Sequence, residues 1–403
     1  MNNIHVIEGG VTAPAGFLAG AAAADIKYKN KKDVTVLYSE TPATAAGVFT
    51  KNVVKAAPVQ ISIKQLERGQ ARGIVVNSGN ANACTGAGGL TDAAAMIAAA
   101  ASALGTEEEM ILIASTGVIG QPLPMNKVLP GIREAVAGMS DVGGREAAEA
   151  IMTTDTCIKE AAREITLGGR QARIGGMAKG AGMIHPDMAT LLCFITSDAA
   201  ILPVYLKQAL RQAVGKSFNM VTVDRDTSTN DTALILANGL AGNPVINGEG
   251  NDFRIFCEAL TEVCISLAKD IARDGEGATK LIQVTARNAP ALADARMASK
   301  AVAGSNLVKA ALFGNDANWG RIICALGYSG ANFQPEKVDI YLGELMVAQQ
   351  GAPANFSEEA ALEILKRDTV DIILDLHQGD CEATAWGCDL TYDYVKINGD
   401  YRT

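Results

Sequence analysis

The sequence has little histidine, few aromatic residues and no excess of basic residues. Three histidines, His5, His185 and His377, occur in 403 residues. A histidine-rich metal site is therefore excluded, and a Ser-His-Asp triad would have to use one of the three. The net charge of −9 leaves no basic footprint for nucleic acid. We expect no bound metal and no nucleic-acid partner.

Long hydrophobic runs and paired cysteines are lacking as well. The longest small-apolar stretches, 17–24 and 93–104, are too short to span a bilayer, and no export signal opens the chain. The eight cysteines include no Cys-x-x-Cys pair, which is typical of reduced thiols and not of a disulfide framework. The sequence predicts a cytoplasmic protein with no membrane partner.

Strand and helix patterns alternate along the whole chain. Strand patterns cover 33–40, 73–79, 110–114, 191–195, 280–288, 338–346, 370–379 and 381–399, and helical patterns cover 91–105, 203–214 and 253–275. This interleaving predicts the α/β (α+β) class with mixed sheets. At this length we expect two domains or one large layered domain, and no Pro/Ser-rich linker separates two halves.

The sharpest break in composition falls at "GMIHPDMATLLCFITSDA", residues 182–199. Glycines and a proline precede Thr190, and an apolar run that reads as a buried strand follows it. One interpretation is that threonine favours strands and a strand begins there. The other is that Thr190 is a nucleophile placed at the mouth of a loop.

The sequence supports other kinds of catalytic or nucleotide site less well than a Thr190 nucleophile. Gly180 and Gly182 lack the third glycine and the helix of a dinucleotide fingerprint, and no GxxxxGK[ST] or GxSxG motif occurs. Cys84 has no histidine near it in sequence, so an inert thiol is the better interpretation. His185 is a candidate base for Thr190, and a loop histidine that makes only a local hydrogen bond is the alternative.

A threonine becomes an effective nucleophile when it is the N-terminal residue, because its own α-amine then accepts the hydroxyl proton. Reaching that state requires self-cleavage at Ala189–Thr190, through attack of the hydroxyl on the preceding carbonyl and hydrolysis of the ester that forms. The reaction also needs an oxyanion hole on a rigid turn. The "STG" turn at 115–117 fits, with a hydroxyl from Thr116 and a close backbone N–H from Gly117.

Several segments together resemble the ornithine acetyltransferase family, the self-cleaving glutamate N-acetyltransferases of arginine biosynthesis. The segment "KGAGMIHPDMATLLCFITSDA" is similar to the family's cleavage and nucleophile motif. Six further segments are similar and in the family order: "VVNSGNANACTG" (75–86), "ASTGVIG" (114–120), "IMTTDT" (151–156), "RDTSTNDT" (225–232), "RDGEGATK" (273–280) and "NWGRI" (318–322). The closing "INGDYRT" (397–403) resembles the family C-terminus, so the resemblance covers essentially the full chain.

The resemblance implies specific site residues. Thr190 is the nucleophile and new N-terminus, cleavage falls at Ala189–Thr190, and Thr116 and Gly117 form the oxyanion hole. The implied residues that hold the amino-acid substrate are Lys179, Glu276, Asn398, Thr403 and either Thr153 or Thr154, a register that the sequence leaves open. A cation for the carboxylate and an anion for the amine suit a zwitterionic substrate.

The resemblance also implies a fold, a reaction and an assembly. The fold is a layered αββα arrangement cut into an alpha chain, 1–189, and a beta chain, 190–403, which stay associated as α2β2. The reaction moves acetyl from N2-acetyl-L-ornithine to L-glutamate through acetyl-Thr190, with no cofactor. Whether acetyl-CoA also serves as acetyl donor is left open, and the alternative is a self-processing amidohydrolase or aminopeptidase of similar fold.

Overall fold

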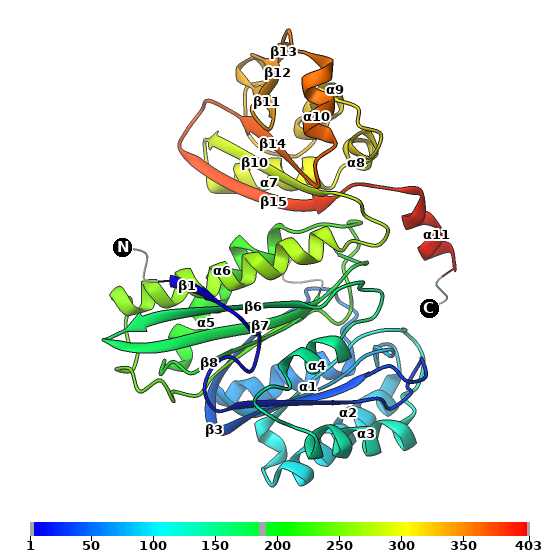
Figure 1. Cartoon of the computed structure of the whole chain (residues 1–403), viewed down its shortest axis with the longest axis vertical. Coiled ribbons are helices and arrows are strands. Elements are labelled where there is room, and N and C mark those ends of the chain that lie inside the picture. The colour runs from blue at the N-terminus through cyan, green and yellow to red at the C-terminus, as the bar shows by residue number, and fades with distance from the viewer. Residues whose placement is uncertain (1–3, 185–190, 401–403) are drawn as a thin grey trace.

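The computed structural model describes residues 4–184 and 191–400 and contains two β-sheets. The larger sheet forms the lower body in Figure 1, and the smaller sheet forms the upper unit with helices from the last third of the chain. The strands of the larger sheet are β1 (Ile4–Ile7), β2 (Phe17–Ala22), β3 (Val34–Phe49), β4 (Gln70–Asn77), β5 (Ile111–Ser115), β6 (Lys159–Leu167), β7 (Arg170–Lys179), β8 (Leu192–Ser197) and β9 (Thr232–Ala237).

The smaller sheet and the helices complete the set of elements. Its strands are β10 (Leu281–Ala289), β11 (Asp339–Leu342), β12 (Leu345–Gln349), β13 (Ala352–Pro353), β14 (Thr369–Asp375) and β15 (Cys381–Cys388). The helices are α1 (Ala57–Gln65), α2 (Gly86–Leu104), α3 (Met125–Ala137), α4 (Gly144–Ala150), α5 (Pro203–Lys216), α6 (Asn251–Arg273), α7 (Leu292–Ala303), α8 (Asn306–Phe313), α9 (Trp319–Gly327), α10 (Glu358–Leu365) and α11 (Tyr392–Asp400).

The larger sheet has the order β1-β6-β7-β8-β9-β3-β4-β5, with β2 also paired to β3. Strand β3 joins its two halves, because the first part of β3 pairs with β2 and β4 while the second part pairs with β9. One hydrophobic cluster contains residues from both halves, including Leu37, Leu112, Phe194 and Leu234. The two halves therefore pack face to face.

Alternation along the strands assigns each side chain to one layer. In β8, Phe194 belongs to the cluster between the two halves, whereas Ile195 belongs to the cluster that contains α5 and α6. In β5, Leu112 faces inward and Ile113 packs with α2 and α3. Successive strand residues point to opposite faces, so both faces of each half are covered. The order of layers is helix, sheet, sheet, helix, which confirms the mixed α/β fold with αββα layers.

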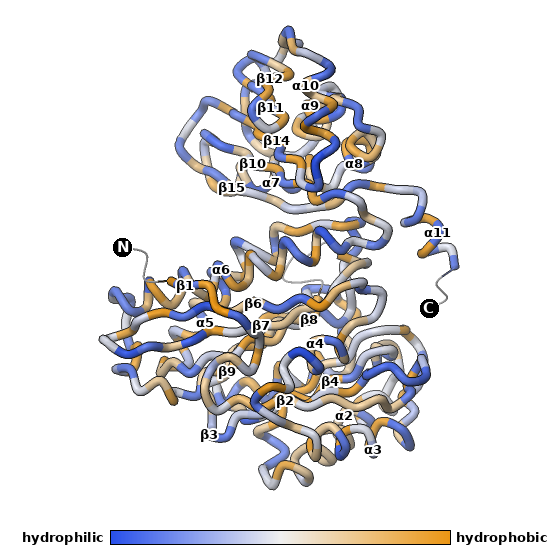
Figure 2. The backbone as a smooth tube through the Cα atoms, in the orientation of Figure 1, coloured by the Kyte–Doolittle hydropathy of each residue, from blue (hydrophilic) through white to orange (hydrophobic). Residues whose placement is uncertain are grey.

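The apolar positions in Figure 2 follow these layers, since hydrophobic segments line the strands and the helix faces turned toward them. Helix α6 illustrates the rule: its fully buried positions include Phe256, Leu260, Val263 and Leu267, at helical spacing. The same helix contacts β6 on one side and β15 on the other. It therefore lies between the lower body and the upper unit (Figure 1).

Residues before and after the predicted cleavage position share one sheet. Strand β8 pairs with β7 on one side and with β9 on the other, and β9 pairs with β3. Strands β3 and β7 precede residue 189, and β8 and β9 follow it. The division into 1–189 and 190–403 thus does not coincide with the division into two sheets.

Two sequence-based expectations about helices are wrong. The pattern at 381–399 predicted a strand, but only β15 is extended and residues 392–400 form α11. Helix α2 ends at Gly105, as predicted, but begins at Gly86 and not near Thr91. At 19 residues it is long and apolar enough to cross a membrane by length and composition. In this fold its buried face, with Met96 and Ile97, packs in a core cluster with α3 and β5.

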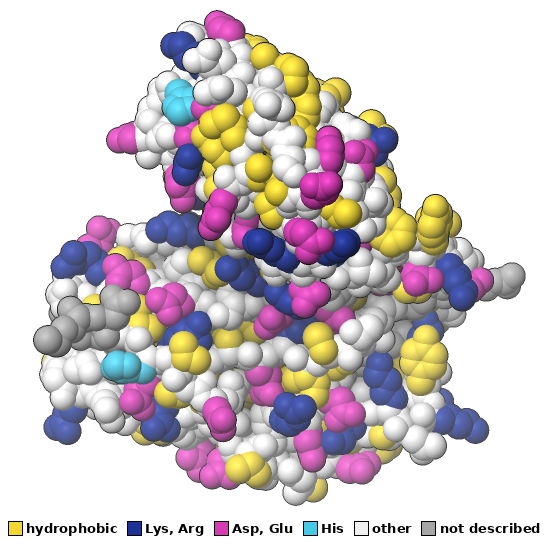
Figure 3. Space-filling model, turned by 45° about the horizontal axis from the view of Figure 1, so that its top comes forward, with side chains coloured by type: hydrophobic (Ala, Val, Ile, Leu, Met, Phe, Trp, Pro, Cys, Tyr) yellow, Lys and Arg dark blue, Asp and Glu magenta, His cyan; other side chains and the backbone are white. Residues whose placement is uncertain are grey.

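Charged side chains of both signs are interspersed over the face shown in Figure 3. Basic and acidic side chains alternate there over short distances, and no large area carries a single sign. This distribution agrees with the acidic net charge of the chain.

Candidate active site

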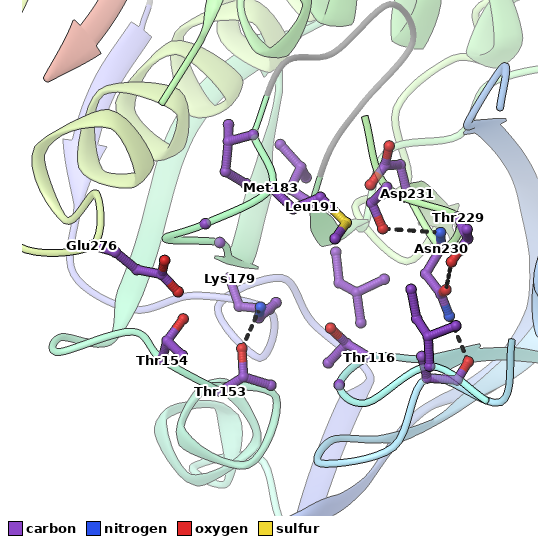
Figure 4. Close-up of a pocket in the computed structure, with 18 of the residues that line it drawn as sticks. Thr116, Thr153, Thr154, Lys179, Met183, Leu191, Thr229, Asn230, Asp231 and Glu276 are labelled. Atoms are coloured by element: carbon purple, nitrogen blue, oxygen red, sulfur yellow. Dashed lines mark hydrogen bonds between the residues drawn. The ribbon is translucent and has the colours of Figure 1, made fainter. Parts of the chain in front are cut away.

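A pocket of about 150 Å³ opens in the larger sheet, where β5 and β7 end and β8 and β9 begin (Figure 4). Its lining is Ala81, Thr116, Gly117, Ile119, Thr153, Thr154, Lys179, Gly180, Gly182, Met183, Ile184, Leu191, Leu192, Ser228, Thr229, Asn230, Asp231, Glu276 and Asn398. These residues come from both sides of the predicted cleavage position, so the pocket depends on both parts of the chain.

The pocket gathers seven residues that the sequence singled out: Thr116, Gly117, Thr153, Thr154, Lys179, Glu276 and Asn398. The predicted cleavage residues Ala189 and Thr190, the candidate base His185 and the terminal Thr403 lie outside the described residues. Leu191, the next residue after Thr190, lines the pocket. The predicted substrate and oxyanion residues therefore converge beside the chain position of the predicted nucleophile.

The turn after β5 places Thr116 and Gly117 at the pocket. The Thr116 backbone N–H is already bound to the carbonyl of Asn77, at 3.0 Å. Among the described residues, neither the Thr116 hydroxyl nor the Gly117 N–H has a hydrogen-bond partner. These two donors are therefore available to a developing oxyanion. Gly117 has φ +134°, and an added Cβ would lie 2.3 Å from the Gly79 carbonyl carbon.

Buried amides hold this turn in place. The Asn77 side chain accepts a hydrogen bond from Ser115 at 2.6 Å and donates one to the Asn80 carbonyl at 2.9 Å. Asn230, at the start of the segment leading into β9, donates to the carbonyls of Ser115 and Ala81, at 2.8 and 2.6 Å. A network of satisfied buried polar groups favours one geometry, so the donors of the turn are preorganised.

Lys179, the last residue of β7, brings a cation to the pocket. Its Nζ donates to the Thr153 hydroxyl at 2.6 Å and lies 3.6 Å from Asp155 Oδ2. Asp155 also accepts hydrogen bonds from Lys159 Nζ at 2.8 Å and from the Gly180 N–H at 2.6 Å. Burial alone would raise the pKa of Asp155, but the ammonium groups of Lys179 and Lys159 outweigh burial and hold it below its usual range. The anionic Asp155 thus fixes the Lys179 ammonium.

Glu276 supplies an anion at the pocket, from the loop between α6 and β10. Its backbone N–H donates to the Ala181 carbonyl at 2.9 Å, and its carboxylate accepts a hydrogen bond from Asn398 at 2.8 Å. Gly182 is packed so closely that an added Cβ would lie 2.5 Å from the Glu276 carboxylate. The loop before the predicted cleavage position and helix α11 therefore hold Glu276 from two sides.

Asp231 is a second carboxyl group in the lining, directly before β9. Its side chain is almost fully buried, and Oδ2 has no hydrogen-bond partner among the described residues. Burial raises the pKa of Asp231 well above its usual range, against hydrogen bonds from Ser228, Thr50 and the Leu191 backbone. Burial therefore favours the neutral form of this carboxyl group.

The sequence missed Asp155, Asp231 and Asn230 as site residues. All three belong to segments that the sequence singled out, "IMTTDT" and "RDTSTNDT". Acidic and amide residues usually lie at the surface, so only their burial in the folded chain separates them from solvated loop residues. Two polar residues directly before a strand that is apolar after its first residue were the available signal, since Asn230 and Asp231 precede β9.

Within residues 4–184 and 191–400, no group of three or more His, Cys, Asp or Glu side chains could hold a metal ion. The pocket is instead lined by hydroxyls, amides, one lysine and two acidic side chains. That set of groups suits an acyl transfer in which hydrogen-bond donors stabilise the oxyanion and charged side chains orient the substrate.

Comparison with known proteins identifies the family. The ArgJ family pattern matches residues 18–403. Arginine biosynthesis bifunctional protein ArgJ of Symbiobacterium thermophilum is 59% identical over 399 residues, which cover 98% of this chain and 99% of that protein. The protein of the same name from Bacillus subtilis is 47% identical over 406 residues, which cover 100% and 98%. The crystal structure of arginine biosynthesis bifunctional protein argJ from Bacillus halodurans matches with a TM-score of 0.50 and 49% identity, over 51% of this chain and 97% of that one. This chain belongs to the ArgJ family.

Proposed function

We propose that this enzyme transfers the acetyl group of N2-acetyl-L-ornithine to L-glutamate through an acetyl ester on Thr190, as an acyltransferase of arginine biosynthesis. One observation carries the proposal: an ammonium group, a carboxylate and two free oxyanion donors converge in one pocket beside Leu191 (Figure 4). Relatives that match the full length are named as arginine biosynthesis bifunctional proteins, which supports the assignment.

The charged residues orient the amino acid. Lys179 binds the substrate carboxylate and Glu276 binds the α-amino group or its acylated nitrogen, with Asn398 beside it. Of the two candidate threonines, Thr153 already accepts a hydrogen bond from Lys179. The Thr154 hydroxyl has no partner among the described residues and lines the pocket, which favours Thr154 as the one that contacts substrate. Thr403 completes the proposed binding set.

The Thr190 hydroxyl attacks the acetyl carbonyl while the Thr190 α-amine accepts its proton. The Thr116 hydroxyl and the Gly117 N–H stabilise the oxyanion, and ornithine leaves with a proton on its nitrogen. The α-amino group of glutamate then attacks the acetyl ester in the same site, and Thr190 is restored. Donor and acceptor share an α-carboxylate and an α-nitrogen, so one pair of charges serves both half-reactions.

The mechanism requires self-cleavage at Ala189–Thr190. The two products, 1–189 and 190–403, would remain joined through the pairing of β7 with β8 and of β3 with β9. The Bacillus halodurans crystal chain is covered to 97% although the match spans only about half of this chain, which supports a mature protein made of two chains. We further propose that two such pairs associate as α2β2 in the cytoplasm, a state that light scattering of the purified enzyme tests.

We propose that acetyl-CoA is a second acetyl donor, so that the same site makes N-acetylglutamate. The word "bifunctional" in the names of the relatives supports this extension. The assay is the formation of N-acetylglutamate from acetyl-CoA and glutamate, with the exchange reaction as reference. Exchange activity without acetyl-CoA use would restrict the enzyme to acetyl transfer from N-acetylornithine.

Thr190→Ala tests the central proposal. The wild-type protein should give two bands of similar mass on a denaturing gel, and the variant should give one full-length band without exchange activity. Wild-type protein that exchanges acetyl groups as a single full-length band would overturn the mechanism. A second assay separates the transferase from a hydrolase. A transferase should release little acetate with or without glutamate, whereas a hydrolase would release acetate in both cases.

A further inference from the structure

Asp231 lies next to Leu191, the first described residue after the predicted cleavage position. Strands β8 and β9 run parallel, with Leu192 in register with Thr232. The residues directly before them, Leu191 and Asp231, are therefore neighbours at the mouth of the pocket. The Thr232 N–H donates to the Leu191 carbonyl at 2.9 Å, and the Leu191 backbone in turn hydrogen-bonds to the Asp231 carboxyl group. Leu191 directly follows Thr190 in the chain, so this carboxyl contacts the residue next to the predicted nucleophile.

The carboxyl group of Asp231 is buried but incompletely bound. Asp231 is 2% exposed, and among the described residues its Oδ2 is buried without a hydrogen-bond partner. Leaving a buried polar atom without a partner is energetically costly, so such atoms are rare and call for an explanation, which is often functional. In Figure 4 the Asp231 side chain lies beside Leu191, at the side of the pocket where β8 begins. The free oxygen is therefore available to a group at the pocket.

The surroundings of Asp231 favour its neutral form. Burial is the largest influence on its pKa and raises it well above the usual range, and the opposing influences are the hydrogen bonds from Ser228 and Thr50 and the charge of Lys179. The Lys179 ammonium is itself bound to Thr153 and close to Asp155, so it is not a direct partner of Asp231. A carboxyl group can both take and give a proton, and a raised pKa helps it to hold a proton between the two steps.

We propose that Asp231 is the proton relay of self-cleavage, carrying the hydroxyl proton of Thr190 to the amide nitrogen as the Ala189 acyl group moves from nitrogen to oxygen. This inference rests on the proposed function and extends it to a residue outside the predicted site. It separates the residues for cleavage from those for transfer, because Lys179, Glu276 and Asn398 bind the amino acid and are not needed for the proton transfer.

The step balances without any further reactant. The Thr190 oxygen forms a bond to the Ala189 carbonyl carbon, and the bond from that carbon to the Thr190 nitrogen breaks. Asp231 takes the proton of the hydroxyl as the new bond forms and gives a proton to the departing nitrogen, so the carboxyl group ends as it began. Water hydrolyses the resulting ester, which releases the Ala189 carboxylate and restores the Thr190 hydroxyl beside a free α-amine.

Asp231→Asn is the direct test, since the amide keeps the shape and an acceptor for the Leu191 N–H but cannot relay the proton. Self-cleavage of freshly purified protein should slow by about 10²–10⁴-fold, the usual contribution of a positioned acid or base. Asp226→Asn is the matched control, because Asp226 lies on the same loop with an exposed side chain, and it should cleave like wild type. Cleavage of Asp231→Asn at the wild-type rate, with wild type itself cleaving, would overturn the relay and leave the proposed function intact.

Two further measurements separate a relay from a structural role. Asp231→Glu restores an acid, and it should recover part of the cleavage that Asn loses at a comparable melting temperature. Neutral hydroxylamine cuts an ester but not an amide, so it should not speed the cleavage of Asp231→Asn if the acyl shift is the blocked step. Full rescue by hydroxylamine would show that the ester forms without Asp231 and would overturn the proposal, as would equal loss of cleavage in Asn and Glu variants that both melt like wild type.

Discussion

The side-chain amide of Asn398 donates a hydrogen bond to the Glu276 carboxylate at 2.8 Å, although 122 residues separate the two in the chain. The same amide group donates to the Tyr394 carbonyl at 3.0 Å, which fixes it on helix α11. The C-terminal helix therefore reaches the pocket through a single exposed amide. This contact links Glu276, the proposed partner of the substrate nitrogen, to helix α11.

Asn398→Ala should weaken substrate binding and leave self-cleavage unchanged. Loss of one hydrogen bond to a charged group costs about 1.5–3 kcal/mol, so we expect KM for glutamate to rise roughly 10- to 100-fold with a smaller change in kcat. Steady-state exchange kinetics and a denaturing gel of the same preparation provide the measurement. Lys396→Ala on the exposed surface of α11 is the control, and a KM for Asn398→Ala equal to that of the control would remove Asn398 from the binding site.

Thr116→Ala should lower kcat far more than it changes KM. The hydroxyl is one of the two proposed donors for the oxyanion, and loss of such a donor typically costs about 2.7–4 kcal/mol in the barrier, or 10²–10³ in kcat. Thr91→Ala, which removes an exposed hydroxyl from α2, is the matched control. A rise in KM with kcat preserved would assign the Thr116 hydroxyl to substrate binding.

A substitution at Gly117 tests the same turn by displacing its backbone instead of removing a side-chain donor. At φ +134° with the Gly79 and Asn80 backbone within 2.3–2.5 Å of an added Cβ, Gly117→Ala must displace the turn. We expect a lower melting temperature in addition to a lower kcat, whereas Thr116→Ala should melt close to wild type.

Many strands and helices were predictable from local sequence, the order of the layers was implied by the family resemblance, and the buried carboxyl groups were not predicted. The unbroken apolar run at 191–195 specifies a strand with two buried faces, and Gly105 marks the end of α2 with its left-handed backbone conformation. By contrast, aromatic and β-branched residues at 392–395 are typical of a strand, yet they form α11, where Tyr392 stacks edge-on against Phe313. The local propensity of these residues carries no information about a contact with a residue far away in the chain.

Only part of the site was predicted. Seven lining residues were identified from motifs in separate segments, because each motif can be recognised from its own local pattern. The roles of Asp155 and Asp231 depend on what surrounds them: two ammonium groups lower the pKa of the first, and burial raises the pKa of the second. Two carboxyl groups whose pKa values are shifted in opposite directions cannot be told apart in a sequence.

Lys179→Met should narrow the pH range of stability and also raise KM. Asp155 has a folded-state pKa below its unfolded value of about 3.9. Its ionic contacts therefore stabilise the fold above that pH, and this contribution is lost as the pH falls through the folded-state pKa. Removing Lys179 leaves burial opposed by Lys159 and the Gly180 N–H, so the Asp155 pKa rises and the loss begins at a higher pH.

The measurement is the melting temperature of wild type and Lys179→Met between pH 3 and pH 7. We expect the two curves to diverge increasingly toward acid pH. Lys366→Met is the control, because Lys366 forms only an exposed pair with Glu363, and such pairs contribute about 0–1 kcal/mol. Parallel curves for Lys179→Met and wild type would show that Lys179 does not hold the Asp155 charge.

Gly277→Ala should detach α11 from the pocket without touching the cleavage residues. Gly277 has φ +69°, and an added Cβ would lie 2.7 Å from the Tyr394 nitrogen and 2.9 Å from the Asp393 carbonyl carbon. Both atoms are backbone, so the helix has to move, and Asn398 moves with it away from Glu276. We expect KM to rise at least as much as in Asn398→Ala, while self-cleavage stays complete, since Leu191, Thr116 and Asp231 are not in contact with this loop.

Gly399→Ala is the matched control, because an added Cβ there meets nothing within 4 Å, and it should behave like wild type in both assays. Incomplete cleavage of Gly277→Ala at a normal melting temperature would show that the C-terminal helix also acts on the cleavage reaction.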